Sequence, residues 1–227
     1  LVADSAFTLP PGQAPAKTVA WIDAQRSAGR TVVGVNVHPM LIKNASTAEV
    51  EKIITATTRA LIRNSESGNL AWLMLPHDYR GHEGDAVCLA PIHEQLIKAG
   101  GIESHFLDGE HRAADLKALA GHLDGVITGR MHLAIASLGM DVPVFSLTYQ
   151  DKFEGLYRHF DLPLSLQVPP AIFDEDEALA EKLKVFIADL PQLTQTVRAC
   201  RPRVQDLARA NYDTYYRALE KLAPAMT

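Results

Sequence analysis

Residues 124–139 read DGVITGRMHLAIASLG, and this stretch decides the fold. A short apolar strand at 126–128 passes through Gly129 into a helix of small and apolar residues at 131–138. A strand without polar alternation that leads directly into a helix is typical of a parallel sheet covered by helices on both faces. The stretch therefore indicates an α/β protein.

The same pattern recurs on both sides of this stretch. The β-branched run at 31–37 and the segments at 70–75, 102–107 and 142–147 predict four more strands, separated by helical patterns. One helix is expected to begin with a capping box formed by Ser46 and Glu49. Because parallel crossovers are right-handed, the series predicts a doubly wound, mainly parallel Rossmann-like sheet with helices on both faces.

The two ends of the chain differ from this pattern. Residues 1–15 hold three prolines and show no period, which predicts an interdomain linker or arm. Residues 16–190 are expected to form the Rossmann-like domain, and residues 191–227 a terminal helix with Pro202 as a break or a first-turn residue. One domain does not need so long a helix, and the first residue is Leu1. We therefore expect a fragment or processed chain whose last helix packs across a second domain.

The composition argues against two classes of protein. A formal net charge of -5 over 227 residues does not fit a nucleic-acid binder. No apolar run approaches the ~18 residues of a membrane span. Cys88 and Cys200 lie in apolar helical patterns and are interpreted as buried free thiols of a reducing compartment. We expect a protein without a signal peptide or a transmembrane segment.

The loops at the carboxyl ends of the strands carry the candidate site, because ligands bind there in such sheets. After the fourth strand, Gly129 is expected to permit a tight turn. The first amides of the following helix and its positive dipole end favour an anion. Arg130 adds a guanidinium fork for phosphate or carboxylate, and His132 in the first turn can donate a proton. The alternative is an Arg130 on the surface and a His132 packed in the core.

The loop after the second strand, residues 76–87, reads PHDYRGHEGDAV. His77 and Asp78 follow the strand directly. Asp85 stands before the next helix, where it could instead serve as the helix cap. His77 and His82 have no third ligand at a close spacing, so no metal site is predicted.

Two further loops add candidates at the same edge. His38 follows the first strand, and Tyr149, Asp151 and Lys152 open a helix after the fifth strand. Lys152 is interpreted either as a contact for a ligand's negative charge or as an exposed helix lysine. The chain has no GxGxxG after a strand, no GxxxxGK[ST] and no GxSxG. A dinucleotide fingerprint, a P-loop and a hydrolase elbow are therefore unsupported.

Taken together, these loops resemble the polysaccharide pyruvyl transferase family. The resemblance rests on VADSAF with Asp4 and Phe7, VVGVNV, His77 with Asp85, DGVITGRMH and DKFEGL, which span residues 2–156. The family is similar to GT-B glycosyltransferases in having two Rossmann-like domains with a cleft between them. The resemblance implies that this chain is the C-terminal domain, that residues 2–7 follow the hinge, and that the last helix returns to the N-terminal domain.

The resemblance also implies an activity. Family members transfer the pyruvyl group of phosphoenolpyruvate onto two sugar hydroxyls and form a ketal, without a cofactor. Their R-x-H element, which maps to Arg130, Met131 and His132, binds the donor. Members often carry an arginine after the first strand, where this chain has His38. The implied acceptor is a glycan or lipid-linked glycan of an exopolysaccharide or the cell wall, and the implied location is the cytoplasm, including the inner membrane face. A homo-oligomer is left open.

The roles that follow are hypotheses about one transferase site. His132 is the candidate general acid or a ligand of the phosphate, and His77 with Asp78 or Asp85 is the candidate base or orienting pair. The remaining candidates are expected to bind substrate: Gly129, Arg130, Met131, Lys152, Tyr149 and His38. One alternative is a GT-B-like glycosyltransferase that uses a nucleotide sugar, with Asp151 on its ribose. A second alternative is a non-catalytic domain that binds an anion or a sugar.

Overall fold

Six strands form one sheet in the computed structural model, which describes residues 2–81, 84–148, 152–175 and 177–222. The order across the sheet is β3-β2-β1-β4-β5-β6, and every neighbouring pair is parallel. The strands are β1 (Thr31–Asn36), β2 (Leu70–Met74), β3 (Glu103–Phe106), β4 (Gly125–Thr128), β5 (Val144–Leu147) and β6 (Gln167–Val168). This confirms the parallel sheet predicted from the sequence and adds β6, whose two residues are too few to show a pattern.

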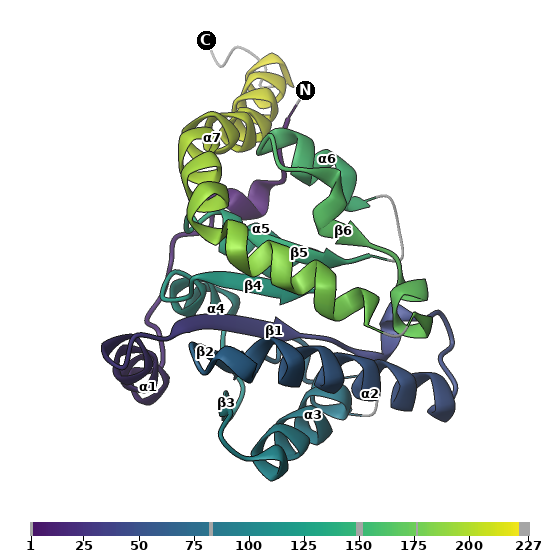
Figure 1. Cartoon of the computed structure of the whole chain (residues 1–227). Coiled ribbons are helices and arrows are strands. Elements are labelled where there is room, and N and C mark those ends of the chain that lie inside the picture. The colour runs from purple at the N-terminus through teal and green to yellow at the C-terminus, as the bar shows by residue number, and fades with distance from the viewer. Residues whose placement is uncertain (1, 82–83, 149–151, 176, 223–227) are drawn as a thin grey trace.

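Helices cover both faces of the sheet (Figure 1). In that view α2 and α7 lie in front of the strands and α4 and α5 lie behind them, which confirms the doubly wound arrangement. The α-helices are α1 (Ala16–Ser27), α2 (Thr47–Asn64), α3 (Ala86–Ala99), α4 (Ala113–Ala120), α5 (Met131–Leu138), α6 (Lys152–His159) and α7 (Ala178–Leu222). Short 3-10 turns are η1 (Ser5–Thr8), η2 (Pro39–Leu41), η3 (Ser65–Ser67), η5 (Leu164–Leu166) and η6 (Pro170–Asp174).

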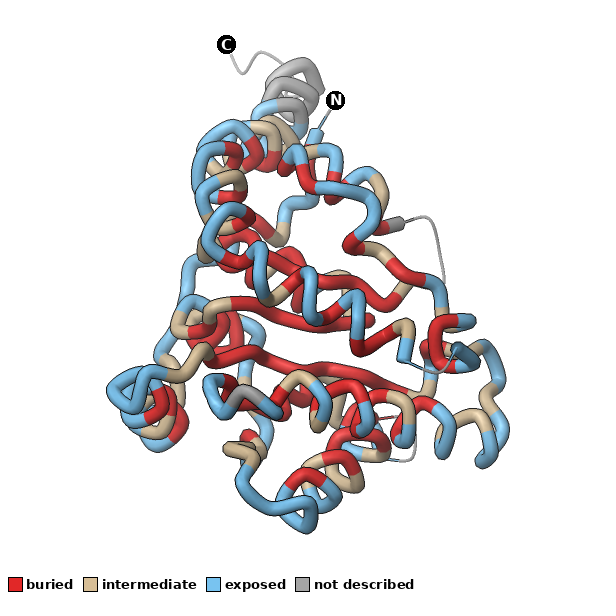
Figure 2. The backbone as a smooth tube through the Cα atoms, viewed as in Figure 1, coloured by how far each residue is buried: buried red, intermediate tan, exposed pale blue. Residues whose placement is uncertain are grey.

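The core lies along the central strands, because their side chains face helices on both sides. Every residue of β2, β4 and β5 is buried, and so is β1 after its first residue (Figure 2). This explains why these strands read as continuous apolar runs instead of alternating with polar residues. Cys88 and Cys200 are buried free thiols, as predicted.

The first residues pack against the domain. Ala3 and Phe7 are buried, and η1 forms inside the stretch that showed no period in the sequence. The ammonium group of Lys117 donates to the carbonyl oxygens of Phe7 at 3.1 Å and Leu9 at 2.7 Å. Residues 2–15 are therefore an arm held on the domain surface by buried side chains and by one buried lysine.

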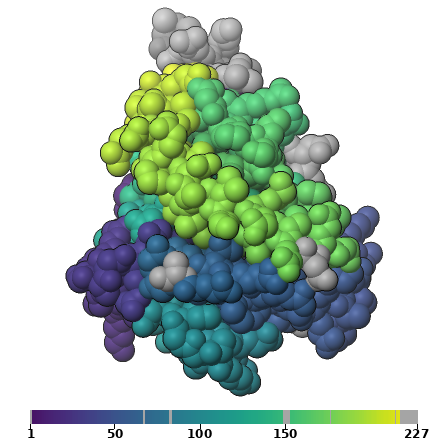
Figure 3. Space-filling model, in the orientation of Figure 1, coloured from purple at the N-terminus to yellow at the C-terminus, as the bar shows by residue number. Residues whose placement is uncertain are grey.

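The last helix differs from the sequence prediction. α7 runs from Ala178 to Leu222 and contains both Pro191 and Pro202, so the predicted break or helix start at Pro202 is wrong. The helix lies over α2 (Figure 3) and then turns toward the N-terminal turn η1 (Figure 1). Proline bends a helix without ending it when packing supplies the missing stabilisation. Among the described residues, no helix has the length and apolar character to cross a membrane.

Candidate functional site

The candidate site lies where the strand order reverses. β1 and β4 are neighbours in the sheet although β2 and β3 come between them in the chain, and Asn36 pairs with Thr128 at their carboxyl ends. The segments that follow these two strands therefore leave the sheet side by side. In doubly wound sheets this switch point forms the crevice in which ligands bind.

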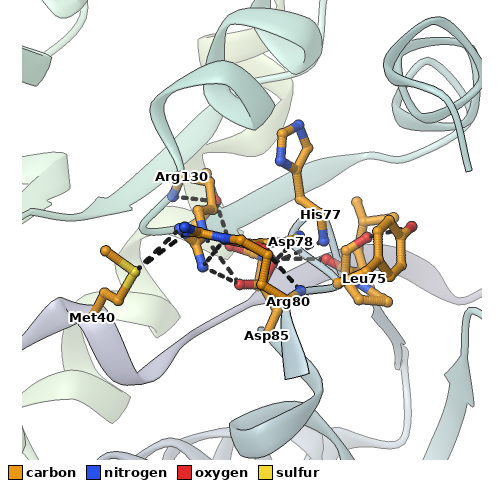
Figure 4. Close-up of polar contacts among 11 residues, drawn as sticks. Met40, Leu75, His77, Asp78, Arg80, Asp85 and Arg130 are labelled. Carbon is orange, nitrogen blue, oxygen red and sulfur yellow. Dashed lines mark hydrogen bonds and ion pairs between the residues drawn. The ribbon is translucent and has the colours of Figure 1, made fainter. Parts of the chain in front are cut away.

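Asp85 is the centre of the polar contacts at this point (Figure 4). Its side chain has no exposed surface. One carboxylate oxygen accepts from the amide nitrogen of Asn36 at 2.6 Å and from the backbone N–H groups of His77 at 2.8 Å and Asp78 at 3.0 Å. The other oxygen accepts from the Nε and Nη2 atoms of Arg130 at 3.0 and 2.7 Å. This one carboxylate ties together the ends of β1, β2 and β4.

The contacts of Asp85 correct two expectations. Asp85 stands at the cap position of α3, but its side chain makes no cap bond, because it is turned toward the strand ends. His77 is linked to Asp85 through its backbone N–H, whereas its ring points away from the carboxylate (Figure 4). The orienting pair expected between the His77 ring and Asp85 is therefore not formed.

Arg130 occupies the first position of the turn into α5. Its backbone N–H donates to the hydroxyl oxygen of Thr128 at 2.9 Å, and its guanidinium reaches back over the sheet edge to Asp85. The Nη2 atom also lies 3.1 Å from the Oδ2 atom of Asp78, and the Nη1 atom lies 3.9 Å from the sulfur of Met40. The side chain is only 15 % exposed, so Arg130 is neither a free surface residue nor fully enclosed.

Two residues that the sequence prediction missed connect these contacts. The side-chain amide of Asn36 donates to the carbonyl oxygen of Leu75 at 3.0 Å as well as to Asp85, and its oxygen accepts from the Thr128 hydroxyl at 2.9 Å. Asn36 and Thr128 are both fully buried. A buried amide in an apolar strand is costly unless all its hydrogen bonds are made. The asparagine inside VVGVNV was the available signal.

Asp78 is held by two guanidinium groups. Arg80 donates to it from Nε at 2.9 Å and from Nη2 at 2.6 Å, and Arg130 contacts the same Oδ2 atom. The hydrogen bonds from the Arg80 side chain hold the pKa of Asp78 far below its usual range, and Arg130 acts in the same direction. Because so weak a base accepts a proton poorly, the geometry does not favour Asp78 as a general base.

A cavity of about 290 Å³ opens beside this cluster. Its lining consists of His77, Asp78, Tyr79, Arg130, Met131 and His132. Burial lowers the pKa of His77 below its ordinary value, while His132 is exposed in the first turn of α5. The backbone N–H groups of residues 131–133 precede the first hydrogen bond within the helix, so they and the helix dipole are available to an anion.

Larger hollows exist elsewhere in the described part of the chain and are also lined by charged side chains, but none of them is lined by the turn that follows β4 at the switch point. A hollow of about 790 Å³ lies at the opposite end of the sheet, beside Thr31 and Leu70, which begin β1 and β2. The smaller cavity is the stronger candidate site, because it lies at the switch point, where ligands of doubly wound sheets bind.

His38 and Gly129 form the layer beneath the cavity. His38 is buried under the turn after β4 and does not line the cavity, in contrast to the expected ligand contact. Burial, and then the neighbouring Arg130 guanidinium, lower the pKa of His38 to about 4. Neither ring nitrogen makes a well-formed hydrogen bond to a described residue, although the Gly129 backbone is close enough to raise the pKa slightly.

Gly129 is needed for close approach and not for an unusual backbone angle. It is absent from the residues of the described chain with positive φ. A Cβ atom at this position would lie 2.4 Å from the Cδ2 atom of Leu41, 2.8 Å from the Nε2 atom of His38 and 3.2 Å from the carbonyl oxygen of Leu147. The turn therefore packs directly on the His38 ring.

Four expected or considered positions lie partly or wholly outside what the structure describes. Tyr149, Asp151 and His82 are outside the described residues. Lys152 begins α6, but its side chain is not described. Among the residues that are described, no group of three or more His, Cys, Asp or Glu side chains is arranged to hold a metal ion.

Comparisons with known proteins complete the description of the site. A family model described as polysaccharide pyruvyl transferase matches residues 1–151, about two thirds of the chain, including both loops that line the cavity. No curated protein matches the chain at a significant level.

Two solved structures share the fold. One is a protein from Listeria monocytogenes named as a UDP-N-acetylglucosamine 2-epimerase, with a TM-score of 0.59 and 12 % identity over 89 % of this chain and 48 % of that one. The other is a UDP-forming α,α-trehalose-phosphate synthase from Burkholderia xenovorans, with a TM-score of 0.52 and 16 % identity over 96 % and 52 % of the two chains. The chain thus spans about half the length of these structures, and the similarity confirms the Rossmann-like, GT-B-like fold.

Proposed function

The chain belongs to the polysaccharide pyruvyl transferase family, and from this membership and the cavity beside Arg130 we propose that it binds phosphoenolpyruvate as a pyruvyl donor for a glycan. One observation carries the proposal. A guanidinium group, a free helix N-terminus and two histidines converge on one cavity at the switch point of the sheet. The donor carries a phosphate and a carboxylate, so it needs a site of this chemistry.

The donor's anionic groups are proposed to bind at the start of α5. The N–H groups of Met131 and His132 point along the helix dipole, and Arg130 supplies a fixed guanidinium at the cavity wall. Gly129 brings this turn close to the sheet edge. Lys152 and Tyr149 remain proposed contacts for the second anionic group, because they follow the adjacent strand β5.

Ketal formation needs one proton at the methylene carbon of the donor, which becomes a methyl group. The middle carbon, then oxocarbenium-like, accepts the oxygen of one sugar hydroxyl, phosphate leaves, and the second hydroxyl closes the ring at the same carbon. The two hydroxyls release two protons. One balances the proton given to the methylene carbon, and the other leaves with the phosphate. The reaction thus requires an acid, a base and stabilisation of anionic groups, without a redox step or a cofactor.

The two histidines suit the proton transfers. His132 stands at the cavity edge with an exposed imidazole and is proposed as a ligand of the donor's phosphate and as the acid. His77 is proposed as the base, because burial lowers its pKa and therefore favours the neutral ring. Asp85 is proposed to position Arg130 and the His77 loop. The acceptor is proposed to be a glycan or a lipid-linked glycan, with the reaction in the cytoplasm or at the inner membrane face.

Ligand-induced stabilisation of the whole chain tests the proposal. We expect phosphoenolpyruvate to raise the melting temperature, because a ligand that binds only the folded state stabilises it by mass action. His132→Ala is expected to lose most of this shift with little change in the unliganded melting temperature, since His132 is exposed. His122→Ala is the matched control, because His122 precedes β4 and lies at the opposite end of that strand.

Three results would contradict the proposal. A shift caused by UDP or GDP but not by phosphoenolpyruvate would favour a glycosyltransferase that uses a nucleotide sugar. A shift with phosphoenolpyruvate that survives in His132→Ala would remove His132 from the site. No shift with any of the three ligands would favour a domain with another function.

A further inference from the structure

Asp78 places a carboxylate on Arg130 inside the cavity proposed for the donor. The Oδ2 atom of Asp78 lies 3.1 Å from the Nη2 atom of Arg130, and both side chains line the cavity, with 13 % and 15 % of their surfaces exposed. A carboxylate oxygen is the same kind of hydrogen-bond acceptor as an oxygen of phosphate or of the donor's own carboxylate. Asp78 thus occupies a position that an anionic ligand would take.

We propose that Asp78 is a resident counter-ion that the donor must displace from Arg130, and that Arg80 retains the displaced carboxylate. The inference rests on the proposed function, because the displacing group is an oxyanion of the donor. It makes the Asp78–Arg80 pair a determinant of donor affinity, separate from the groups that perform the chemistry.

The unequal attachment of the two aspartates supports this assignment. Asp85 is fully buried and accepts from five donors, two of them on Arg130, so it cannot leave without exposing several unpaired groups. Asp78 has a single contact with Arg130, and it is longer than either contact between Arg130 and Asp85. Of the two carboxylates, Asp78 is the one that can be replaced.

Arg80 gives Asp78 an alternative partner. It contacts both carboxylate oxygens, with Nε at 2.9 and 3.1 Å and Nη2 at 2.6 Å, and its backbone N–H donates to Oδ1 at 3.1 Å. Because Arg80 is 62 % exposed whereas Arg130 is 15 % exposed, the Asp78–Arg80 pair can turn toward solvent while Arg130 stays in place. Asp78 therefore keeps a charged partner after it leaves Arg130.

The charge balance of the cavity explains why displacement matters. Asp85 and Asp78 place two carboxylates against the Arg130 guanidinium, so a resident Asp78 repels an anion that enters beside Arg130. A like charge within about 4–6 Å changes the proton affinity of a carboxylate by roughly one unit or more. We expect an effect of the same order, about tenfold, on the affinity for an oxyanion.

The test compares Asp78→Asn, Arg80→Gln and the double variant in the full chain. The dissociation constants of inorganic phosphate and phosphoenolpyruvate are measured by calorimetry. Asp78→Asn is expected to tighten binding about tenfold, because the competing charge is gone. Arg80→Gln is expected to weaken binding, because Asp78 then depends on Arg130. In the double variant, Arg80→Gln should no longer weaken ligand binding, since Arg80 acts on the affinity through Asp78.

A matched control is the Asp206–Arg209 ion pair on α7, which has the same residue types and lies outside the cavity. Asp206→Asn is expected to bind both ligands as the wild type does. Displacement predicts that Asp78→Asn tightens ligand binding and that Arg80→Gln weakens it. If the ion pair had only a structural role, both variants would weaken binding.

The outcomes separate this inference from the proposed function. If the wild type binds phosphoenolpyruvate and Asp78→Asn binds it equally well or more weakly, the inference is wrong and the donor site stands. If neither protein binds phosphoenolpyruvate or phosphate, the proposed function fails and the inference fails with it.

Discussion

Asp85 has no exposed surface, and its charged partner is Arg130 on a different element of the fold. Removing one member of a buried pair leaves the other without compensation, which typically costs about 3–5 kcal/mol. This explains why the arginine that best suits an anion is also a structural residue. A variant of Arg130 would lose ligand affinity and stability together, and it would not separate the two roles.

Substitution of the two aspartates tests their different roles. Asp85→Asn is expected to lower the free energy of unfolding by about 3–5 kcal/mol, because it removes the charge that faces Arg130 and presents an N–H group to existing donors. Asp78→Asn, at a partly exposed pair, is expected to cost about 1 kcal/mol or less. Urea unfolding of both variants measures the difference. Equal losses would mean that Asp85 is not the structural centre of the cluster.

At the scale of elements, the turns after β1 and β4 enclose His38. Its pKa is lowered to about 4 in the folded chain, against an ordinary value of 6.5. Between these values the unfolded chain binds a proton at His38 that the folded chain does not bind, so stability falls as the pH falls. Full stability is present above about pH 6.5, and the loss is complete below about pH 4.

The His38→Leu variant isolates this effect from that of the other histidines. Between pH 6.5 and 4 the wild type is expected to lose about 3 kcal/mol of unfolding free energy more than the variant, since each pKa unit corresponds to about 1.4 kcal/mol. Urea unfolding at several pH values provides the measurement. Parallel pH profiles for the two proteins would show that the turns do not exclude a charged His38.

The sequence predicted elements well where local signals are strong. The capping box formed by Ser46 and Glu49 is present at the start of α2, and α5 runs from Met131 to Leu138 as expected. The sequence predicted α7 less well, because Pro202 is a helix breaker locally but lies here in a part of the helix that packs on the domain, between Leu179 and Ala208. Tertiary packing, which no local pattern encodes, decided that outcome.

The position of the candidate site was predictable from the sequence, but the hydrogen bonds and ion pairs between its residues were not. Parallel strands and polar residues after them predicted the carboxyl edge, and Arg130, His132, His77 and Asp78 do line one cavity there. The partner of Arg130 depends on the meeting of β1 and β4, which are distant in the chain. For the same reason, local sequence did not give the burial of His38 or the hydrogen-bond partners of Asn36, although the asparagine inside an apolar strand marked its position.

On the scale of the whole molecule, the central claim is that an anionic donor binds at the switch point between β1 and β4. The most direct test is a crystal structure of the chain with phosphoenolpyruvate. We expect one anionic group of the donor within hydrogen-bond distance of the Arg130 guanidinium and of the N–H groups of Met131 and His132, with Asp78 turned toward Arg80. Donor density in the hollow beside Thr31 and Leu70, or an empty cavity at saturating donor, would contradict the account.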